Sequence, residues 1–435
     1  MEFTLLELTE VLKISFRADE LSWIFAIMTT VVWLMAGIYS FGYMAHDVYK
    51  KRYACFYMLV YFVLLGLDFS ANLITMYLFY ELMTLASMPL IIHELKKESV
   101  SAAMKYLYYS IAGAFLALFG IFVLSQVSPS MEFAAGGHMT LDTIQNKGLV
   151  LAALFLMILG FGAKAGIFPL HAWLPIAHPV APAPASAVLS GVVVKSGVLA
   201  MMRSVFFVVG PEVLRGSWVQ TAWMVLALLT IVMGSTRAYH ENLFKKRLAY
   251  STVSQLSYVL FGLSTLHPIG IAGALLHVLF HSVAKSLLFM SAGSVIHQTG
   301  KTKVSELRGV GRQMPVTLGC FTLGALSLVG IPPFAGFFSK WYLANGALAS
   351  EVPVFGWLGP VILLLSALLT AGYLFPISVE GFLPGKAYNK NPEKSCEAGW
   401  NMTIPMMILA VLALVLGIFS SGIIDFVVQL ATGLM

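Results

Sequence analysis

Apolar stretches of about 20 residues follow one another along almost the whole chain, and each is long enough to cross a bilayer as a helix. The chain has 435 residues, of which 59% are hydrophobic and 11% are charged. A soluble domain usually carries about 25% charged residues. The pattern therefore predicts an all-α polytopic membrane protein and excludes an ordinary soluble domain.

We predict twelve transmembrane helices, and we expect the polar residues 1–21 before them to lie along the membrane surface. The predicted helices lie near residues 22–44, 53–67, 73–93, 106–126, 148–170, 180–209, 218–236, 249–266, 271–297, 315–346, 357–380 and 402–430.

The loops support this assignment because their basic residues divide unevenly between the two faces of the membrane. One face receives four, which are Lys13, Arg17, Lys147 and Arg215. The other receives seventeen: Lys50, Lys51, Arg52, Lys96, Lys97, Lys105, Arg237, Lys245, Lys246, Arg247, Lys301, Lys303, Arg308, Arg312, Lys386, Lys390 and Lys394. The face richer in Lys and Arg is normally cytoplasmic. We therefore expect a multi-pass protein of the cell inner (cytoplasmic) membrane with both termini outside.

Glycine and proline interrupt two of the predicted helices. Helix 148–170 ends in Gly-Ala-Lys-Ala-Gly-Ile-Phe-Pro, and helix 315–346 contains Gly-Ile-Pro-Pro-Phe-Ala-Gly. Proline removes a backbone donor, and glycine weakens a helix. The two breaks are five crossings apart and run in opposite directions, which predicts two inverted five-helix repeats, each containing a broken helix. The predicted units are 1–52 (N-terminal segment and first helix), 53–209 (first repeat), 210–380 (second repeat) and 381–435 (loop and last helix).

Five basic residues fall inside the apolar segments rather than in loops: Lys164, Lys195, Arg203, Lys285 and Lys340. A charge inside a bilayer costs several kcal/mol at least, so such residues are rare and usually line a pathway. Glu81 lies equally deep. We interpret Glu81 and Lys164 as a pair that exchanges a proton and Lys195 as a proton carrier. The alternatives are a static ion pair and lysines that extend to the interface.

Histidines accompany these lysines. His277, His281 and Lys285 are spaced four residues apart, which places them on one face of a helix that would line a hydrated path. His171 and His178 bracket a proline-rich segment and either hand on protons or cap helix ends. Lys340 follows the second break and is either the outlet of the path or an interfacial anchor. Arg203 lies closer to the end of its helix, so we expect it to be an anchor, and a guanidinium does not release its proton at ordinary pH.

Cofactor-binding motifs are missing from the chain. The cysteines Cys55, Cys320 and Cys396 are scattered, and no CxxC pair or nucleotide-binding glycine motif occurs. We therefore expect no cofactor and no metal in this chain. The net charge of +6 reflects loop lysines rather than nucleic-acid binding. The cluster Lys245, Lys246 and Arg247 is a topology signal or a contact for membrane lipids.

Several stretches closely resemble one known family. They are FRADELSWIF, YELMTLAS, GAKAGIFPLHAWLPIAHPVAPAPASAVLSGVVVKSGV, KKRLAYSTVSQLSY, HVLFHSVAKSLLF and GIPPFAGFFSKW. They resemble the antiporter-like, proton-conducting subunits shared by respiratory complex I, Mrp-type Na⁺/H⁺ antiporters and membrane-bound hydrogenases. The last stretch is most similar to Mrp D-type and hydrogenase-type subunits.

The resemblance implies roles for the same residues. Glu81 and Lys164 would be the input pair, and Lys195 the central carrier. His277, His281 and Lys285 would be the link, and Lys340 the terminal lysine. Full-length relatives have fourteen crossings, of which this chain begins at the third. It lacks the lateral helix that some relatives add after the last crossing, which argues against the distal subunit type.

These observations lead us to expect a proton-translocating subunit of a multisubunit ion-pumping complex. Its partners would be other membrane subunits, and its ions protons, with Na⁺ in an Mrp-type complex. Any iron–sulfur or nickel–iron centre would lie in a partner subunit, so enzymatic activity, if any, belongs to the complex. The alternatives are a stand-alone twelve-helix solute transporter and a passive scaffold whose buried charges hold subunits together. A quinone-binding redox subunit is disfavoured because nothing marks a quinone pocket.

Overall fold

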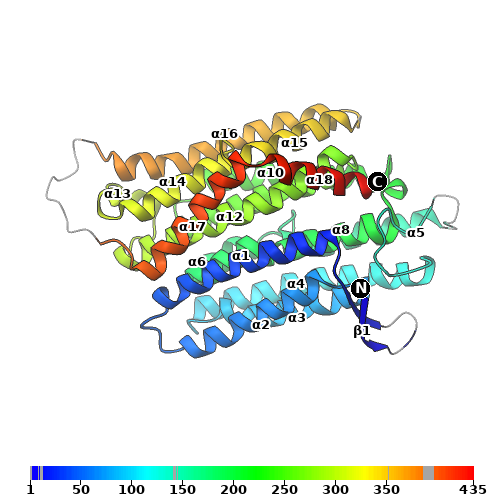
Figure 1. The fold of residues 1–435 in the computed structure, drawn as a ribbon, viewed down its shortest axis with the longest axis horizontal. Coiled ribbons are helices and arrows are strands. Elements are labelled where there is room, and N and C mark those ends of the chain that lie inside the picture. Colours follow the sequence, from blue (N-terminus) through cyan, green and yellow to red (C-terminus); the bar gives the residue numbers. More distant parts are fainter. Residues whose placement is uncertain are drawn as a thin grey trace.

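The computed structural model describes residues 2–7, 9, 13–140, 144, 146–350, 352–385 and 396–435. It is a bundle of long helices whose axes run roughly side by side (Figure 1). The N-terminal hairpin and the C-terminus lie toward the same end of the bundle (Figure 1). We call this end the terminal end and the opposite end, which carries most of the basic loops, the basic end.

The first half of the chain forms a two-stranded antiparallel hairpin and the helices of the expected first repeat. Its elements are β1 (Glu2–Glu7), β2 (Lys13–Arg17), α1 (Glu20–Tyr43), α2 (Lys50–Asp68), α3 (Leu73–Ile91), α4 (Lys97–Val127), α5 (Lys147–Ala165), α6 (Leu174–Val180), α7 (Ala183–Val188), η1 (Leu189–Val193), α8 (Lys195–Met202) and η2 (Arg203–Val209). The segments η1 and η2 are π-helical turns within one apolar helix that runs from α7 to η2.

The second half contains the remaining helices. They are α9 (Pro211–Leu214), α10 (Trp218–His240), α11 (Phe244–Ser264), α12 (Pro268–Thr299), η3 (Val304–Glu306), α13 (Val310–Gln313), α14 (Pro315–Val329), α15 (Ala335–Ala349), α16 (Phe355–Phe382), α17 (Trp400–Ile418) and α18 (Ser421–Gly433). Of these, α12 lies at the centre, since it packs against α11, α14, α15 and α17 and also against α1 and α7.

The expected membrane crossings are present. Within the described residues, nine helices are long and apolar enough to cross a membrane. The helices α2 and α11 have 19 and 21 residues and lie in the same bundle, although they are more polar. The broken helix made of α14 and α15 completes the set of twelve. The polytopic all-α architecture is therefore confirmed, whereas the bounds of the four sequence units stay predictions.

Both expected breaks occur, and the same local motif produces them. Helix α5 ends at Gly166 and α14 ends at Gly330, and each glycine has the left-handed conformation that other residues rarely adopt. In each case the following isoleucine amide bonds to a carbonyl five residues back: Ile167 to Gly162, and Ile331 to Leu326. This pattern closes a helix by satisfying its last carbonyls. Each break is therefore a regular helix terminus whose last carbonyls are hydrogen-bonded.

The hairpin at the N-terminus was not expected from the sequence. Its register and its position depend on partners far along the chain: Arg17 N–H donates to Phe69 O, and Ala71 N–H donates to Ser15 O. Helix α2 ends at Asp68, and these bonds hold β2 across the loop that joins α2 to α3. Residues 13–17 are therefore held against the end of the bundle by hydrogen bonds, and their position along the membrane surface stays a prediction.

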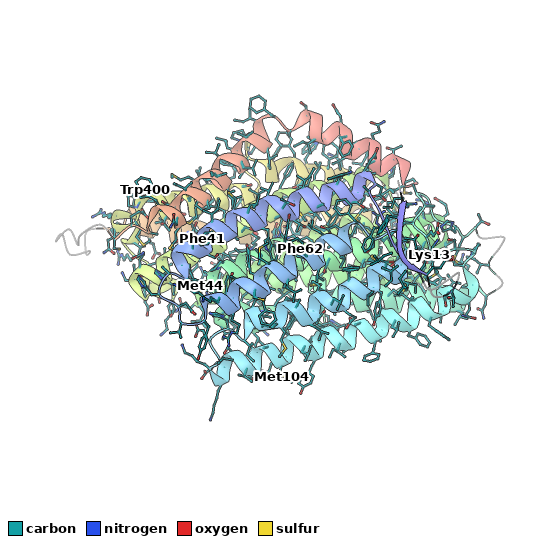
Figure 2. All side chains as sticks on the ribbon, turned by 60° about the horizontal axis from the view of Figure 1, so that its bottom comes forward. Lys13, Phe41, Met44, Phe62, Met104 and Trp400 are labelled. Carbon is teal, nitrogen blue, oxygen red and sulfur yellow. The ribbon has the colours of Figure 1, made fainter. Side chains whose placement is uncertain are left out.

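The outer surface of the bundle is apolar, as a membrane requires. Large side chains such as Phe41, Phe62 and Trp400 are exposed on it, and they are labelled in Figure 2. Much of the basic charge lies in the loops at one end, as expected. Three of the loop lysines counted in the sequence, Lys386, Lys390 and Lys394, lie outside the described residues.

Candidate functional site

Lys164 lies in the last turn of α5, just before the first break, and is fully buried. Its ammonium donates to three hydroxyls at 2.9 Å: Thr84 Oγ1 of α3, and Tyr106 OH and Ser110 Oγ of α4. The Tyr106 ring also faces the ammonium, with 4.4 Å between Nζ and the ring centroid. These contacts satisfy all three N–H donors of the lysine.

Glu81 lies on α3 but does not contact Lys164. In the described part of the chain, neither residue takes part in an ion pair. Glu81 is half-buried, and its Oε1 is buried without a hydrogen-bond partner. The two charges still interact electrostatically. The proton-exchanging pair therefore stays a prediction, and this structure has Lys164 on its hydroxyl partners.

Lys195 is the first residue of α8 and is separated from the π-helical turn η1 only by Val194. The side chain is fully buried, and its ammonium donates to the carbonyl of Ser190, which belongs to that turn. Wide π-helical turns within α-helices often occur at functional sites. Lys195 interacts electrostatically with Lys285 and with His178, His277 and His281, so the structure brings these groups into one neighbourhood.

His277, His281 and Lys285 lie along the face of α12 that packs against α11 and α15. The Nδ1 of His277 is 2.9 Å from Ser339 Oγ on α15, and its Nε2 is 3.1 Å from Gln255 Oε1 on α11. The rings of His277 and His281 are 5.8 Å apart. Both nitrogens of His281 are buried without a partner. Lys285 Nζ donates to Leu248 O of α11 at 3.0 Å. The three residues therefore form the buried polar stripe that their spacing predicts.

Lys340 lies on α15, and its side chain extends back to the end of α14. Its ammonium donates to Leu328 O at 2.7 Å and to Val329 O at 2.8 Å. These carbonyls are among the last of α14, where the helix dipole favours a cation. The nitrogen also lies 5.4 Å from the centre of the Tyr258 ring. The hydrogen-bond partners of Lys340 are therefore carbonyls at the second break. This agrees with the sequence, in which Lys340 follows that break.

The two histidines around the proline-rich segment have different surroundings. His178 is fully buried in α6, stacks on Phe289 of α12 at 4.6 Å, and has no hydrogen-bond partner on either nitrogen. It interacts electrostatically with Lys195 and Lys285, so it belongs to the buried polar row. His171 lies in the turn between α5 and α6, stacks on Phe168 and interacts with Arg237.

Sequence reasoning missed one buried carboxylate and one ion pair. Asp68, the last residue of α2, is 3% exposed and accepts a hydrogen bond from Thr29 Oγ1 at 3.1 Å. The only sequence signal was its position directly after an apolar segment. Arg203 is 1% exposed and holds Asp19 through two hydrogen bonds of 2.6 and 2.7 Å. Since Asp19 is also the N-cap of α1, Arg203 anchors the start of that helix, as its sequence position suggested.

Two of the three basic residues in the first turn of α11, Lys245 and Arg247, are directed inward, whereas Lys246 pairs with Glu241. Lys245 donates to Ala181 O at 2.8 Å, and Arg247 donates to Glu241 O and Tyr373 O. Both side chains are less than one tenth exposed. Within the described residues, no group of three or more His, Cys, Asp or Glu could hold a metal ion.

The ion pair between Asp19 and Arg203 makes stability depend on pH. Burial raises the pKa of Asp19, but the hydrogen bonds and charge of Arg203 outweigh it, so the pKa lies below its ordinary value. The stabilisation is therefore complete above about pH 4 and is lost as the pH falls through the folded-state pKa. Replacing Asp19 by Asn leaves Arg203 buried and unpaired, which should cost about 3 kcal/mol at neutral pH.

Thermal unfolding of the detergent-solubilised protein between pH 3 and pH 7 checks this. The Asp19→Asn variant should unfold earlier at pH 7 and lose less stability on acidification than the wild type. The matched control is Glu212→Gln, because the Glu212–Arg215 pair is exposed and should contribute at most about 1 kcal/mol. Equal pH profiles for Asp19→Asn and the wild type would contradict the assignment.

Known families, proteins and solved structures are similar to this chain. The family described as "NADH:quinone oxidoreductase/Mrp antiporter, TM" matches residues 70–370, and the one described as "NADH-Ubiquinone oxidoreductase (complex I), chain 5 N-terminus" matches residues 9–57. NADH-quinone oxidoreductase subunit N of Desulforudis audaxviator is 35% identical over 85% of this chain and 74% of its own length. Hydrogenase-4 component B of Escherichia coli is 28% identical over 97% of this chain. The A1-type component of the Na⁺/H⁺ antiporter of Staphylococcus haemolyticus is 31% identical over 95% of it.

The matched region spans 65% of the hydrogenase component and 53% of the antiporter component. Two solved structures have the same fold. A chain of the Mrp complex from Dietzia sp. superposes with a TM-score of 0.87 at 22% identity, over 100% of this chain and 87% of that one. A chain of respiratory complex I from Thermus thermophilus gives 0.84 at 21% identity, over 100% and 89%. The Staphylococcus haemolyticus relative is of the A1 type, so the resemblance to D-type subunits stays a prediction.

Proposed function

Because the chain belongs to the family of antiporter-like membrane subunits shared by NADH:quinone oxidoreductase and Mrp antiporters, we propose that it translocates protons within a multisubunit complex. One observation carries the proposal. The side chains of His178, Lys195, Lys285, His281 and His277 are buried inside one bundle and interact with one another, although a membrane interior disfavours every one of these charges. We call these five residues and Lys340 the relay.

The relay gives protons a route from the basic end of the bundle. His178 interacts electrostatically with Lys245, near that end, and with Lys195 and Lys285. Lys195 accepts the proton, and Lys285, His281 and His277 carry it along α12 to Lys340 beside the second break. Burial disfavours the charged form of a lysine, so these amines both bind and release protons. By the distribution of basic loops, the proton enters from the cytoplasm and leaves on the side of the termini.

Glu81 and Lys164 set the charge at the start of the route. Charges in a low-dielectric interior interact over long distances, so moving Lys164 from its hydroxyl partners toward Glu81 changes how readily Lys195 holds a proton. The driving event comes from partner subunits, either through redox chemistry at their iron–sulfur or nickel–iron centres or through exchange with Na⁺. The partners are other membrane subunits, and membrane lipids surround the assembly in the cell inner membrane.

The Lys285→Met variant tests the function against the scaffold alternative. If Lys285 carries protons, we expect proton transport by the reconstituted complex to fall at least about tenfold, since loss of one station adds more than ~1.4 kcal/mol to the barrier. The amounts of all subunits in the purified complex should stay unchanged. Transport is measured by a pH-sensitive dye in proteoliposomes, and subunit content by gel and mass spectrometry.

The control is Lys51→Met, which removes an exposed lysine in the first turn of α2 and should leave transport intact. A Lys285→Met complex that comes apart but still couples transport in the intact fraction would support a scaffold instead. The stand-alone transporter has a separate test, because the purified chain in liposomes would then take up a solute without any partner.

A further inference from the structure

A second row of buried polar side chains lies between α10, α11 and α16. Its centre is a triangle of serine hydroxyls, one from each helix: Ser235, Ser254 and Ser366. The oxygen–oxygen distances are 2.7 Å (Ser235–Ser254), 2.5 Å (Ser235–Ser366) and 3.2 Å (Ser254–Ser366), and all three residues are at most 1% exposed. A hydroxyl both donates and accepts, so such contacts can pass a proton in either direction.

The row continues toward the basic end of the bundle. Tyr373 OH of α16 donates to Ser251 Oγ at 2.7 Å and to Thr370 Oγ1 at 3.2 Å. Ser251 precedes Ser254 by one helical turn on α11, and Thr370 follows Ser366 by one turn on α16. Arg247, in the first turn of α11, donates to the carbonyl of Tyr373 at 2.9 Å. The row therefore begins beside the first turn of α11, at the basic end of the bundle.

The row also reaches the relay. The Tyr258 hydroxyl interacts with the side chains of Ser366 and Gln255, and it donates to Leu363 O at 3.0 Å. The carbonyl oxygen of Gln255 is 3.1 Å from His277 Nε2. The Tyr258 ring stacks on His277 at 5.4 Å between centroids, and the same ring faces Lys340. The inner end of the row thus meets His277 and Lys340 and bypasses Lys195.

Gln255 supplies an independent sign that water enters this row. Its Nε2 is fully buried and, within the described residues, makes no hydrogen bond of normal geometry, although the side chain interacts with the Tyr258 hydroxyl. An unpaired buried donor costs about 1–3 kcal/mol, and a water molecule that bridges buried polar groups removes that cost.

We propose that the second repeat contains its own access route from the basic end, by which protons reach His277 and Lys340 without passing Lys195. The row consists of the side chains of Tyr373, Ser251, Thr370, the serine triangle, Tyr258 and Gln255. It holds a chain of water molecules. Each hydroxyl accepts a proton on one side and releases its own on the other, so no group changes its charge permanently. The proposal rests on the proposed function of the relay.

Cysteine accessibility in the assembled complex tests the route. Ser366→Cys and Ser254→Cys are made singly in a chain whose native cysteines are replaced by serine (Cys55, Cys320, Cys396). The probe is 2-aminoethyl methanethiosulfonate, a small cation, added to membrane vesicles with the cytoplasmic face outward. The matched control is Ser291→Cys, because Ser291 is equally buried on α12 but donates to a methionine sulfur.

We expect both row variants to be modified at least tenfold faster than the Ser291→Cys control, and modification to slow proton transport. The second variant guards against misfolding at one position. Rates equal to that of the control, or modification only from the opposite face, would overturn the route. If the relay does not carry protons, the Lys285→Met variant leaves proton transport unchanged. The rates of cysteine modification still test the route in that case, because they depend only on whether water reaches the row.

Discussion

Replacing Lys195 by arginine is expected to stop proton transport as completely as replacing it by methionine. Arginine keeps the positive charge and can still donate to the Ser190 carbonyl, as Lys195 does. It cannot release its proton at any ordinary pH, however. A carrier that never unloads blocks the relay, and we expect transport to fall by about a hundredfold, equivalent to about 2.7 kcal/mol in the barrier.

Comparing Lys195→Arg with Lys195→Met shows whether transport needs a residue that titrates or only a residue that carries a positive charge. If Lys195 only balances charge inside the bundle, Lys195→Arg keeps transport and Lys195→Met loses it. Lys195→His restores a group that titrates and should recover part of the activity. The matched control is Lys105→Met, which removes an exposed lysine of α4. Initial rates of dye quenching in proteoliposomes give the comparison, and full activity of Lys195→Arg would refute the carrier role.

Replacing Gly336 by alanine is expected to cause a large loss of stability for the addition of a single methyl group. Gly336 is the second residue of α15, and a Cβ at this position would overlap the carbonyl oxygen of Ser327 in α14. The oxygen belongs to backbone and the Cβ is fixed to backbone, both close to the second break, so relief requires the two half-helices to move apart. Overpacking of this kind costs about 3 kcal/mol. The movement also disturbs Leu328 O and Val329 O, which hold Lys340.

Gly319 provides the matched control because it lies within α14 and a Cβ there meets nothing within 4 Å. Alanine at that position should leave stability unchanged or raise it by up to about 1 kcal/mol, since alanine favours a helix over glycine. The midpoint of thermal unfolding in detergent and the transport rate measure both effects. A Gly336→Ala variant as stable and active as Gly319→Ala would contradict the close packing at the break.

The parts of the fold that follow from local chemistry were predictable. Long apolar segments have to form helices in a bilayer, because no water is present to bond their backbone. The breaks followed from Gly166 and Gly330 with the prolines after them. The spacing of His277, His281 and Lys285 placed all three on one face, since that depends on helix geometry alone.

The parts that depend on distant contacts were not predictable. The hairpin needs Phe69 and Ala71 as partners, and nothing in residues 1–21 indicates them. The inward direction of Lys245 is set by a carbonyl 64 residues away, at Ala181. Whether Lys164 contacts Glu81 or a set of hydroxyls depends on how α3, α4 and α5 pack, which sequence spacing does not determine. Asp68 was missed because a carboxylate at the end of an apolar segment usually marks its exit into water.

The hydroxyl surroundings of Lys164 tolerate either form of that side chain. A carboxylate in the same place would favour the ammonium strongly and oppose its conversion to an amine. Thr84, Tyr106 and Ser110 can accept from the ammonium, and any one of them can turn its hydrogen toward the lone pair of the neutral amine. Under the proposed function, Lys164 would therefore gain or lose its proton while the three helices around it stay in place.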